Sequence, residues 1–270
     1  MTQTETRSPH FGRAAAVATY RDVHLPRIFA PWAHILLEIV PPRSGDAILD
    51  VATGPGTVAR PAAAIAGPRG RVTGVDLSAA MLEVARSFAA EPGSAPIDYL
   101  ESPATSMPLP DTSFDRGYCQ QGLQHMSDPA AALQEIRRLL KPGARLAVAI
   151  WQQSPFGLFR QVVADLGISA EGAQPSGFGR DPNDLRAVLQ RAGFADVEVQ
   201  TRQLDSILQG GVPQALEVAI ATSAGAGMQD LSSEQQTRVR EALTNAVQPL
   251  LKDDGVHLVS ITNIASATRP

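Results

Sequence analysis

The chain has 270 residues, which is long enough to bury a large core within one α/β domain. It carries 23 Lys and Arg against 27 Asp and Glu, and these charges are scattered, so no basic stripe indicates nucleic-acid binding. Its one cysteine, Cys119, cannot form an internal disulfide, and we expect no metal cluster. No signal-peptide core and no apolar stretch of about 18 residues is present, which predicts a cytoplasmic protein without a membrane span.

The first half of the chain alternates helical and extended patterns. An amphipathic helix is predicted at 29–40, where Pro41 and Pro42 end it. Buried strands follow at 47–52 and 71–75, and Ser78 can cap the next helix. Further strands are predicted at 97–100, 114–119 and 145–151, and between the last two Asp128 and Pro129 begin a helix. This alternation is typical of a parallel sheet covered by helices.

The second half begins in the same way and then changes. Asp181 and Pro182 begin a helix, and a strand is predicted near 197–201. Residues 213–252 have a helical pattern that includes a capping box at Ser232 and Gln235, and only then does a strand follow at 256–264. The complete pattern predicts an α/β fold: a Rossmann-like, mostly parallel seven-stranded sheet with helices on both faces and a helical insert before the last strand.

The segment after the first predicted strand has the features of a nucleoside site. Gly54 and Gly56 allow a tight turn on which a ligand can lie against the backbone, although an ordinary turn has the same pattern. Asp76 ends the second strand twenty residues later, where a carboxylate can accept hydrogen bonds from both ribose hydroxyls. Helix capping is the simpler role for Asp76, but Ser78 is already placed for it.

Two nucleoside cofactors compete for this site. Gly54, Gly56 and Ala59 match the dinucleotide pattern G-x-G-x-x-A, which would suit a NAD(P)-dependent oxidoreductase. Against this, the Asp50 carboxylate precedes the loop and would repel a pyrophosphate, whereas it suits a cationic amino acid group. None of the three tyrosines is followed four residues later by the lysine of short-chain dehydrogenases.

Four motifs then appear in order: DVATGPGT, GVDLSAAMLEVA, MPLPDTSFDRGYCQQGLQHM and EIRRLLKPGARLAVAIW. Over residues 45–152 the chain resembles the class I S-adenosylmethionine-dependent methyltransferases, most of all the ubiquinone and menaquinone biosynthesis type. The resemblance implies a single domain with N-terminal lid helices (1–44), a cofactor-binding core (45–152) and a substrate cap with the final strands (153–270). S-adenosyl-L-methionine is the implied cofactor. Its implied binding residues are Tyr20, Asp50, Ala52, Thr53, Gly54, Gly56, Asp76, Leu77, Met81, Ala104, Thr105, Gln120 and Gln121.

The chain departs from the family pattern at two positions. The first glycine of the loop is replaced by Ala52, which is tolerable if φ is negative. The acid that usually binds the adenine amino group is replaced by Pro103, which has neither a side-chain acceptor nor an amide donor. Adenine must then be held by the Ala104 backbone, by apolar packing, or by Glu101 or Ser102.

Proton removal from the acceptor needs a base, and a histidine suits this task near neutral pH. His125 is the first candidate because it follows the fourth sheet strand, although a structural role is equally compatible with its position. His24, near Tyr20 and Asp22, is the second. Cys119 is expected to be a buried strand residue rather than a nucleophile.

The methyl acceptor is the least defined partner. Residues 153–180 contain Phe156, Phe159 and Phe178, which either cover an apolar pocket or anchor the segment to the core. We expect a small, apolar or aromatic acceptor methylated on oxygen, carbon or nitrogen, and a monomer or homodimer without nucleic-acid partners. A protein that binds the cofactor without transferring methyl groups remains the alternative.

Overall fold

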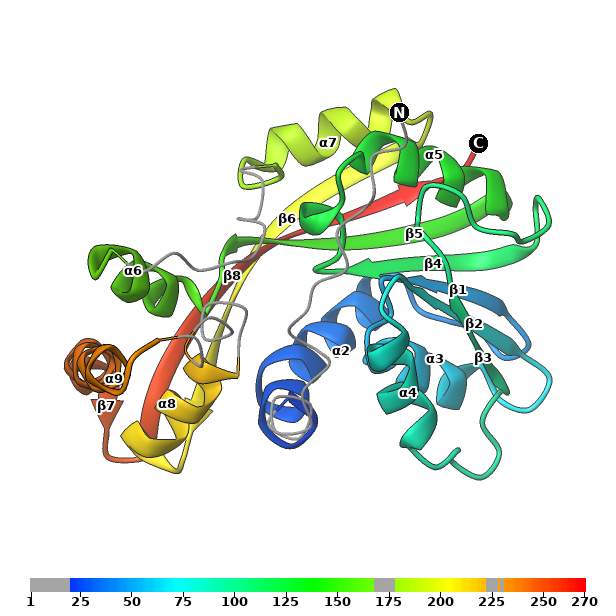
Figure 1. Ribbon diagram of the computed structural model, residues 1–270. Helices are drawn as coiled ribbons and strands as arrows, with labels where there is room; N and C mark the ends of the chain where they lie inside the picture. The colour runs from blue at the N-terminus through cyan, green and yellow to red at the C-terminus, as the bar shows by residue number, and fades with distance from the viewer. Residues whose placement is uncertain (1–19, 168–177, 222–227, 229–230) are drawn as a thin grey trace.

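The computed structural model describes residues 20–167, 178–221, 228 and 231–270. Within these residues one sheet has the strand order β3-β2-β1-β4-β5-β8-β6, and a short β7 pairs with β8 (Figure 1). The neighbours from β3 to β5 are parallel, whereas β8 is antiparallel to both β5 and β6. The predicted mostly parallel sheet is therefore confirmed. The strands are β1 (Ala47–Val51), β2 (Arg71–Asp76), β3 (Ile97–Glu101), β4 (Phe114–Gln120), β5 (Leu140–Gln153), β6 (Ala195–Leu208), β7 (Leu251–Lys252) and β8 (Gly255–Thr268).

Helices cover both faces of the sheet. Figure 1 shows α2 (Ala30–Ile39), α3 (Ala59–Ala66) and α4 (Ala79–Ser87) on one face, with α5 (Pro129–Leu139) and α7 (Pro182–Arg191) on the other. Two buried hydrophobic clusters correspond to these faces, and every residue of β1 is buried between them. This double burial explains why β1 reads as a continuous apolar run rather than an alternating one.

Local capping sets several helix ends as the sequence predicted. The Ser78 hydroxyl accepts a hydrogen bond from the Met81 amide, and the Asp128 carboxylate accepts one from the Ala131 amide. The capping box of Ser232 and Gln235 is formed at the start of α9 (Ser233–Val247). The predicted helix at 29–40 corresponds to α2, but a π-helix, η2 (Tyr20–Phe29), precedes it directly.

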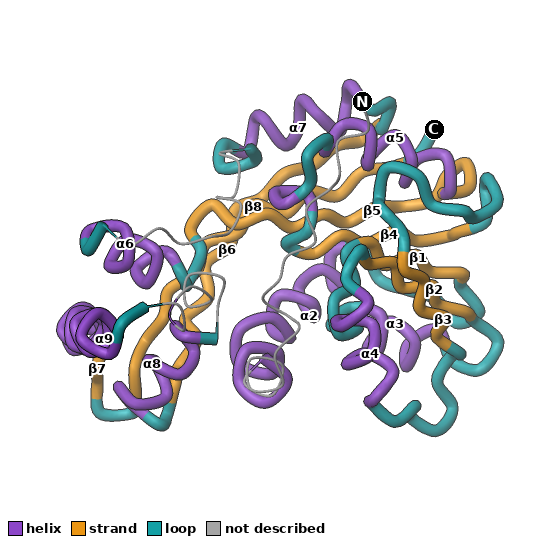
Figure 2. Tube along the Cα trace, viewed as in Figure 1, coloured by secondary structure: helices purple, strands orange, loops and turns teal. Residues whose placement is uncertain are grey.

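The last two long strands extend much further than predicted. β6 and β8 have 14 residues each and pair from Ala195 and Thr268 to Leu208 and Val256. Figure 2 shows their far ends continuing past the rest of the sheet as a two-stranded arm, with α8 (Gly211–Ile220) and α9 beside it. α6 (Gly157–Asp165) packs near α9 in this region. The described helices include none long and apolar enough to cross a membrane.

Candidate active site

The loop that follows β1 turns through three residues with positive φ. They are Ala52 at 57°, Gly54 at 53° and Gly56 at 77°. The condition of a negative φ at Ala52 is not met: its backbone is in the left-handed region, which costs an alanine about 1 kcal/mol. The methyl group of Ala52 lies against Gly122, where an added Cβ would come within 2.5 Å of it. The alanine is accommodated because its neighbour after β4 has no side chain.

Gly56 is required for a second reason besides its backbone angle. The phenol of Tyr99, on β3, lies so close that a Cβ on Gly56 would be 2.5 Å from its hydroxyl oxygen. The Arg60 guanidinium donates to the Gly56 carbonyl at 3.2 Å and lies 3.6 Å from the ring centre of Phe88. The start of α3 is thus held against the loop by side chains that the sequence analysis did not select.

Asp76, at the end of β2, connects the two loops of this region. One carboxylate oxygen accepts a hydrogen bond from the Gly54 amide at 2.8 Å, and the other accepts one from the Ser78 amide at 2.9 Å. Burial raises the pKa of Asp76, while these amides and that of Leu77 counteract the rise. Each carboxylate oxygen can accept more than one hydrogen bond, so both remain able to receive a ribose hydroxyl.

Asp50 lies deeper, near the end of β1. Its Oδ2 atom accepts hydrogen bonds from the Thr53 hydroxyl at 2.6 Å and from the Ala59 amide at 3.0 Å. Its Oδ1 atom is buried without a hydrogen-bond partner among the described residues. Burial raises the pKa of Asp50 to about 7, and the charge of Asp76 adds to the rise. A cationic group beside Asp50 would satisfy the buried oxygen and stabilise the carboxylate, whereas a pyrophosphate would be repelled.

Two glutamines follow β4, the strand next to β1. The side-chain amide of Gln120 donates to the Phe29 carbonyl at 2.9 Å, which attaches the junction of η2 and α2 to the carboxyl end of β4. Gln121 has a φ of 54°, and its amide donates to the Thr262 hydroxyl on β8 at 3.2 Å. The side-chain oxygens of both glutamines are buried without partners among the described residues. Buried acceptors on Asp50 and Gln120 thus lie at the ends of neighbouring strands, where the ammonium group of an amino acid would fit.

Comparisons with known proteins identify the family. A methyltransferase domain model matches residues 49–148. The chain is 31% identical to a demethylmenaquinone methyltransferase of Clavibacter sepedonicus over 183 residues, which cover 62% of this chain and 73% of the relative. The chain belongs to the class I S-adenosylmethionine-dependent methyltransferases. S-adenosyl-L-methionine is the cofactor of this family, and the buried acceptor on Asp50 fits its ammonium group.

Other similarities agree with this assignment. A ubiquinone/menaquinone biosynthesis C-methyltransferase of Hahella chejuensis is 29% identical over 165 residues, which span 54% of this chain and just under two thirds (66%) of that protein. In structure, a Bacillus halodurans protein described as a methyltransferase superposes with a TM-score of 0.60 at 21% identity and covers 88% of this chain and 98% of its own. The last similarity supports the fold alone.

The residues expected near adenine follow β2 and β3, which are neighbouring strands. Met81 is buried, whereas Leu77, Ala104 and Thr105 are partly buried. Ser102 donates its amide to the Asp76 carbonyl at 3.1 Å and its hydroxyl to the Ser106 carbonyl at 3.0 Å, which fixes the turn that contains Pro103. Tyr20 begins η2, but its side chain lies outside the described residues.

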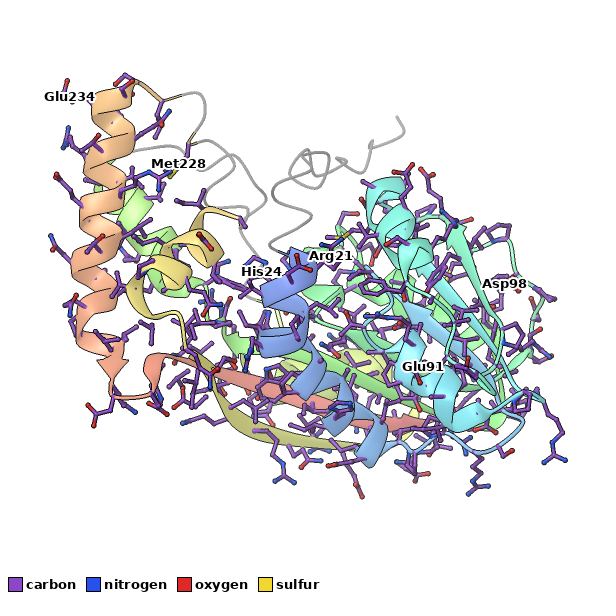
Figure 3. All side chains as sticks on the ribbon, turned by 90° about the horizontal axis from the view of Figure 1, so that it is seen from below. Arg21, His24, Glu91, Asp98, Met228 and Glu234 are labelled. Atoms are coloured by element: carbon purple, nitrogen blue, oxygen red, sulfur yellow. The ribbon has the colours of Figure 1, made fainter. Side chains whose placement is uncertain are left out.

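The two candidate histidines have different surroundings. His125 lies on η3 (Leu123–His125), directly after the β4 loop, and its side chain is exposed at the surface. The residue is accessible to solvent, but the protein around it still partly desolvates the imidazole, and this, with a smaller contribution from the charge of Arg160, lowers its pKa. His24 is buried, its Nε2 lies 3.0 Å from the Val218 carbonyl on α8, and burial lowers its pKa to about 4. Figure 3 shows His24 on the α8 side of η2, with Arg21 on the other side.

Other predicted side chains have structural surroundings. Cys119 is buried, and burial raises the pKa of its thiol to about 12, so it is an inert residue of the strand. Phe159 is 1% exposed and Phe156 9% exposed, and both belong to the core cluster, which favours the anchoring role. Phe178 is partly buried against the opposite cluster. Residues 168–177 of the predicted roof lie outside the described part of the chain.

Proposed function

We propose that the protein transfers the methyl group of S-adenosyl-L-methionine to an oxygen, carbon or nitrogen atom of a small, apolar or aromatic acceptor. The observation that carries the proposal is the pair of carboxylates at the ends of adjacent strands. Asp50 has a buried oxygen without a described partner, and Asp76 joins the glycine loop to the helix that follows β2. The first suits an ammonium group, and the second suits the two hydroxyls of a ribose.

The bound cofactor supplies a methyl group on a positively charged sulfur, which a nucleophile can displace because the leaving group is a neutral thioether. The protein therefore has to align the acceptor and, where the acceptor carries a proton, remove it. His125 is our candidate base: it lies in the loop after β4, and its lowered pKa keeps the imidazole neutral and able to accept a proton at pH 7. His24 is a poorer base because its pKa is about 4.

Aromatic side chains favour an apolar acceptor. Phe29, Trp151 and Phe156 come from η2, β5 and the residue before α6, and the Phe29 ring centre lies 6.3 Å from that of Trp151 and 6.2 Å from that of Phe156. Gln120 donates to the Phe29 backbone, so this cluster begins next to the end of β4. Trp151 and Phe156 are buried in the core, so of the three it is the partly buried Phe29 whose ring can stack on an aromatic acceptor.

Ligand-induced stabilisation tests the cofactor assignment. S-adenosylmethionine and S-adenosylhomocysteine should stabilise the folded protein by mass action, by about 2.7 kcal/mol at a concentration of a hundred times Kd, and so raise its melting temperature. NAD and NADP should leave the melting temperature unchanged. A response to NAD or NADP alone would overturn the proposal. Formation of S-adenosylhomocysteine with candidate phenols and quinols then measures transfer, and binding without any turnover would favour a protein that only binds the cofactor.

A further inference from the structure

Three segments converge at the carboxyl end of β5, outside the cofactor residues described above. The Gln124 side chain, adjacent to His125, accepts a hydrogen bond from the Trp151 amide at 2.9 Å. Arg160 lies in the first turn of α6, and its backbone amide donates to the carbonyl of Phe156, the residue before the helix. The loop after β4 is therefore bonded to the end of β5, and α6 begins directly after that strand at Gly157.

The third segment is held there by a buried asparagine. Asn263, on β8, pairs with Ile150 of β5, and its side-chain amide donates to the carbonyls of Gly179 at 2.9 Å and Arg180 at 2.8 Å. Thr201 donates to the remaining oxygen of Asn263 at 2.7 Å. Gly179 packs so closely that an added Cβ would lie 2.8 Å from Ile150. Arg180 is thereby brought to the same strand end.

The charges of these segments repel one another. Burial and, to a smaller extent, the positive charge of Arg180 lower the pKa of Arg160. Burial and, to a smaller extent, the charge of Arg160 lower the pKa of His125. Among the described residues, neither guanidinium has a carboxylate or other side-chain partner within hydrogen-bond distance, in contrast to Arg138, which pairs with Asp111 and Glu135. Two arginines on segments that meet at one strand end, without an acidic partner among the described residues, are an arrangement that a carboxylate or phosphate stabilises.

We propose that Arg160 and Arg180 form a binding subsite for an anionic group of the methyl acceptor, a carboxylate or a phosphate, beside His125. This inference rests on the proposed function and refines it, since the acceptor would be aromatic or apolar at one end and would carry one anionic group at the other. The anion would place the acceptor next to the candidate base. It would also raise the pKa of His125 by offsetting the charge of Arg160.

Calorimetric titration in saturating S-adenosylhomocysteine tests the subsite with three probes of similar shape. Benzoate and phenyl phosphate carry the two anionic groups, and benzamide is neutral. We expect one or both anions to bind more tightly than benzamide, the better of them identifying the anionic group. Arg160→Gln and Arg180→Gln should each weaken anion binding about tenfold or more, as expected for loss of a charge-assisted hydrogen bond. Arg238→Gln, at an exposed position of α9, is the matched control and should leave anion binding unchanged.

Equal binding of benzoate, phenyl phosphate and benzamide, absence of anion binding, or unchanged affinity in both arginine variants would overturn the inference. Titration of the His125 ring by NMR adds an independent readout. Its pKa should rise in Arg160→Gln and stay unchanged in Arg238→Gln, and an unchanged value in both would show that Arg160 and His125 are not neighbours. S-adenosylhomocysteine binding separates the two proposals: its absence would refute the proposed function, whereas cofactor binding without the anion effects would refute this subsite alone.

Discussion

Replacing Asp76 by alanine tests the cofactor site most directly, because the expected loss of cofactor affinity is larger than the expected loss of folding stability. In the protein without ligand, it accepts the amides of Gly54 and Ser78. A buried donor that loses its acceptor costs about 1–3 kcal/mol, but the Gly54 and Ser78 amides are in loops where water can replace part of the lost hydrogen bonding. Burial raises the pKa of Asp76, so removing the charge also recovers a desolvation cost. We therefore expect Asp76→Ala to lower the free energy of unfolding by about 1–2 kcal/mol.

The loss in cofactor affinity should be larger. Two ribose hydroxyls donating to a carboxylate contribute about 1.5–3 kcal/mol each, and partial replacement by water leaves a net loss of about 3 kcal/mol. This corresponds to a hundredfold rise in Kd, to within about a factor of ten. The cofactor affinity of Asp76→Asn should lie between those of the wild type and Asp76→Ala. The asparagine side chain keeps one acceptor oxygen, but its NH2 group faces the Gly54 or Ser78 amide, which is also a donor.

Calorimetric titration with S-adenosylhomocysteine, beside urea unfolding curves of the same variants, measures both effects. Ser78→Ala is the control: it removes the bond to the Met81 amide and should cost about 1 kcal/mol of stability while affinity stays near that of wild type. If folded Asp76→Ala bound S-adenosylhomocysteine as tightly as wild type, the carboxylate would serve the loops alone and the cofactor would lie elsewhere. Equal affinity losses in both variants would mean that the position of α4, and not the carboxylate, determines binding.

Three other predictions follow from single side chains. His125→Ala should lower turnover by about 10²- to 10⁴-fold with little change in cofactor affinity. Because the pKa of His125 is lowered and its neutral form accepts the proton, the activity of the wild type should be constant above pH 6.5 and fall at acid pH. A folded His125→Ala variant with wild-type turnover would assign His125 a structural role. The pKa of His24 is 6.5 in the unfolded chain and about 4 in the folded protein. The contribution of neutral His24 to the free energy of unfolding is therefore complete above pH 6.5 and is lost as the pH falls toward 4, by about 3 kcal/mol in total. Unfolding curves of His24→Gln should lack this part of the pH dependence. Gly122→Ala should lower stability by about 1–3 kcal/mol because its new methyl would overlap Ala52, and adding Ala52→Gly should restore most of the loss; without such rescue in a double-mutant cycle, the two residues would not be coupled.

Some of the candidate site was accessible from the sequence because it depends on short-range features. Ser78, Asp128 and Ser232 cap helices through amides three residues away, and such bonds need no information from the rest of the fold. The positions of Asp50 and Asp76 at the ends of apolar runs placed them at one edge of a parallel sheet. Their roles toward the cofactor stay predictions.

Other features were wrong or were not predicted, and each depends on a distant neighbour. A strand was predicted near 197–201, but the continuation of β6 to Leu208 was not predicted because Arg202, Gln203 and Asp205 interrupt the apolar pattern. Pairing with β8, predicted at 256–264, holds these residues extended. An alanine at position 52 was expected to need a negative φ, but the space left by Gly122, seventy residues later, allows the left-handed conformation. Sequence periodicity reports burial along one segment and says nothing of the segment that covers it.

The sequence by itself determined the alternation of strands and helices, the glycine loop, the two carboxylates and the resemblance to a family, since these are properties of local composition and spacing. Only the tertiary structure decided which atoms remain without partners. The Asp50 oxygen that has no partner among the described residues, and the bond from Gln120 to Phe29, each depend on segments far apart in the chain. The same holds for Arg180, which a buried asparagine on β8 brings to the strand end that α6 and Arg160 follow. Hydrogen bonding and charge act across space at distances of a few ångström, and the fold alone determines which residues come that close.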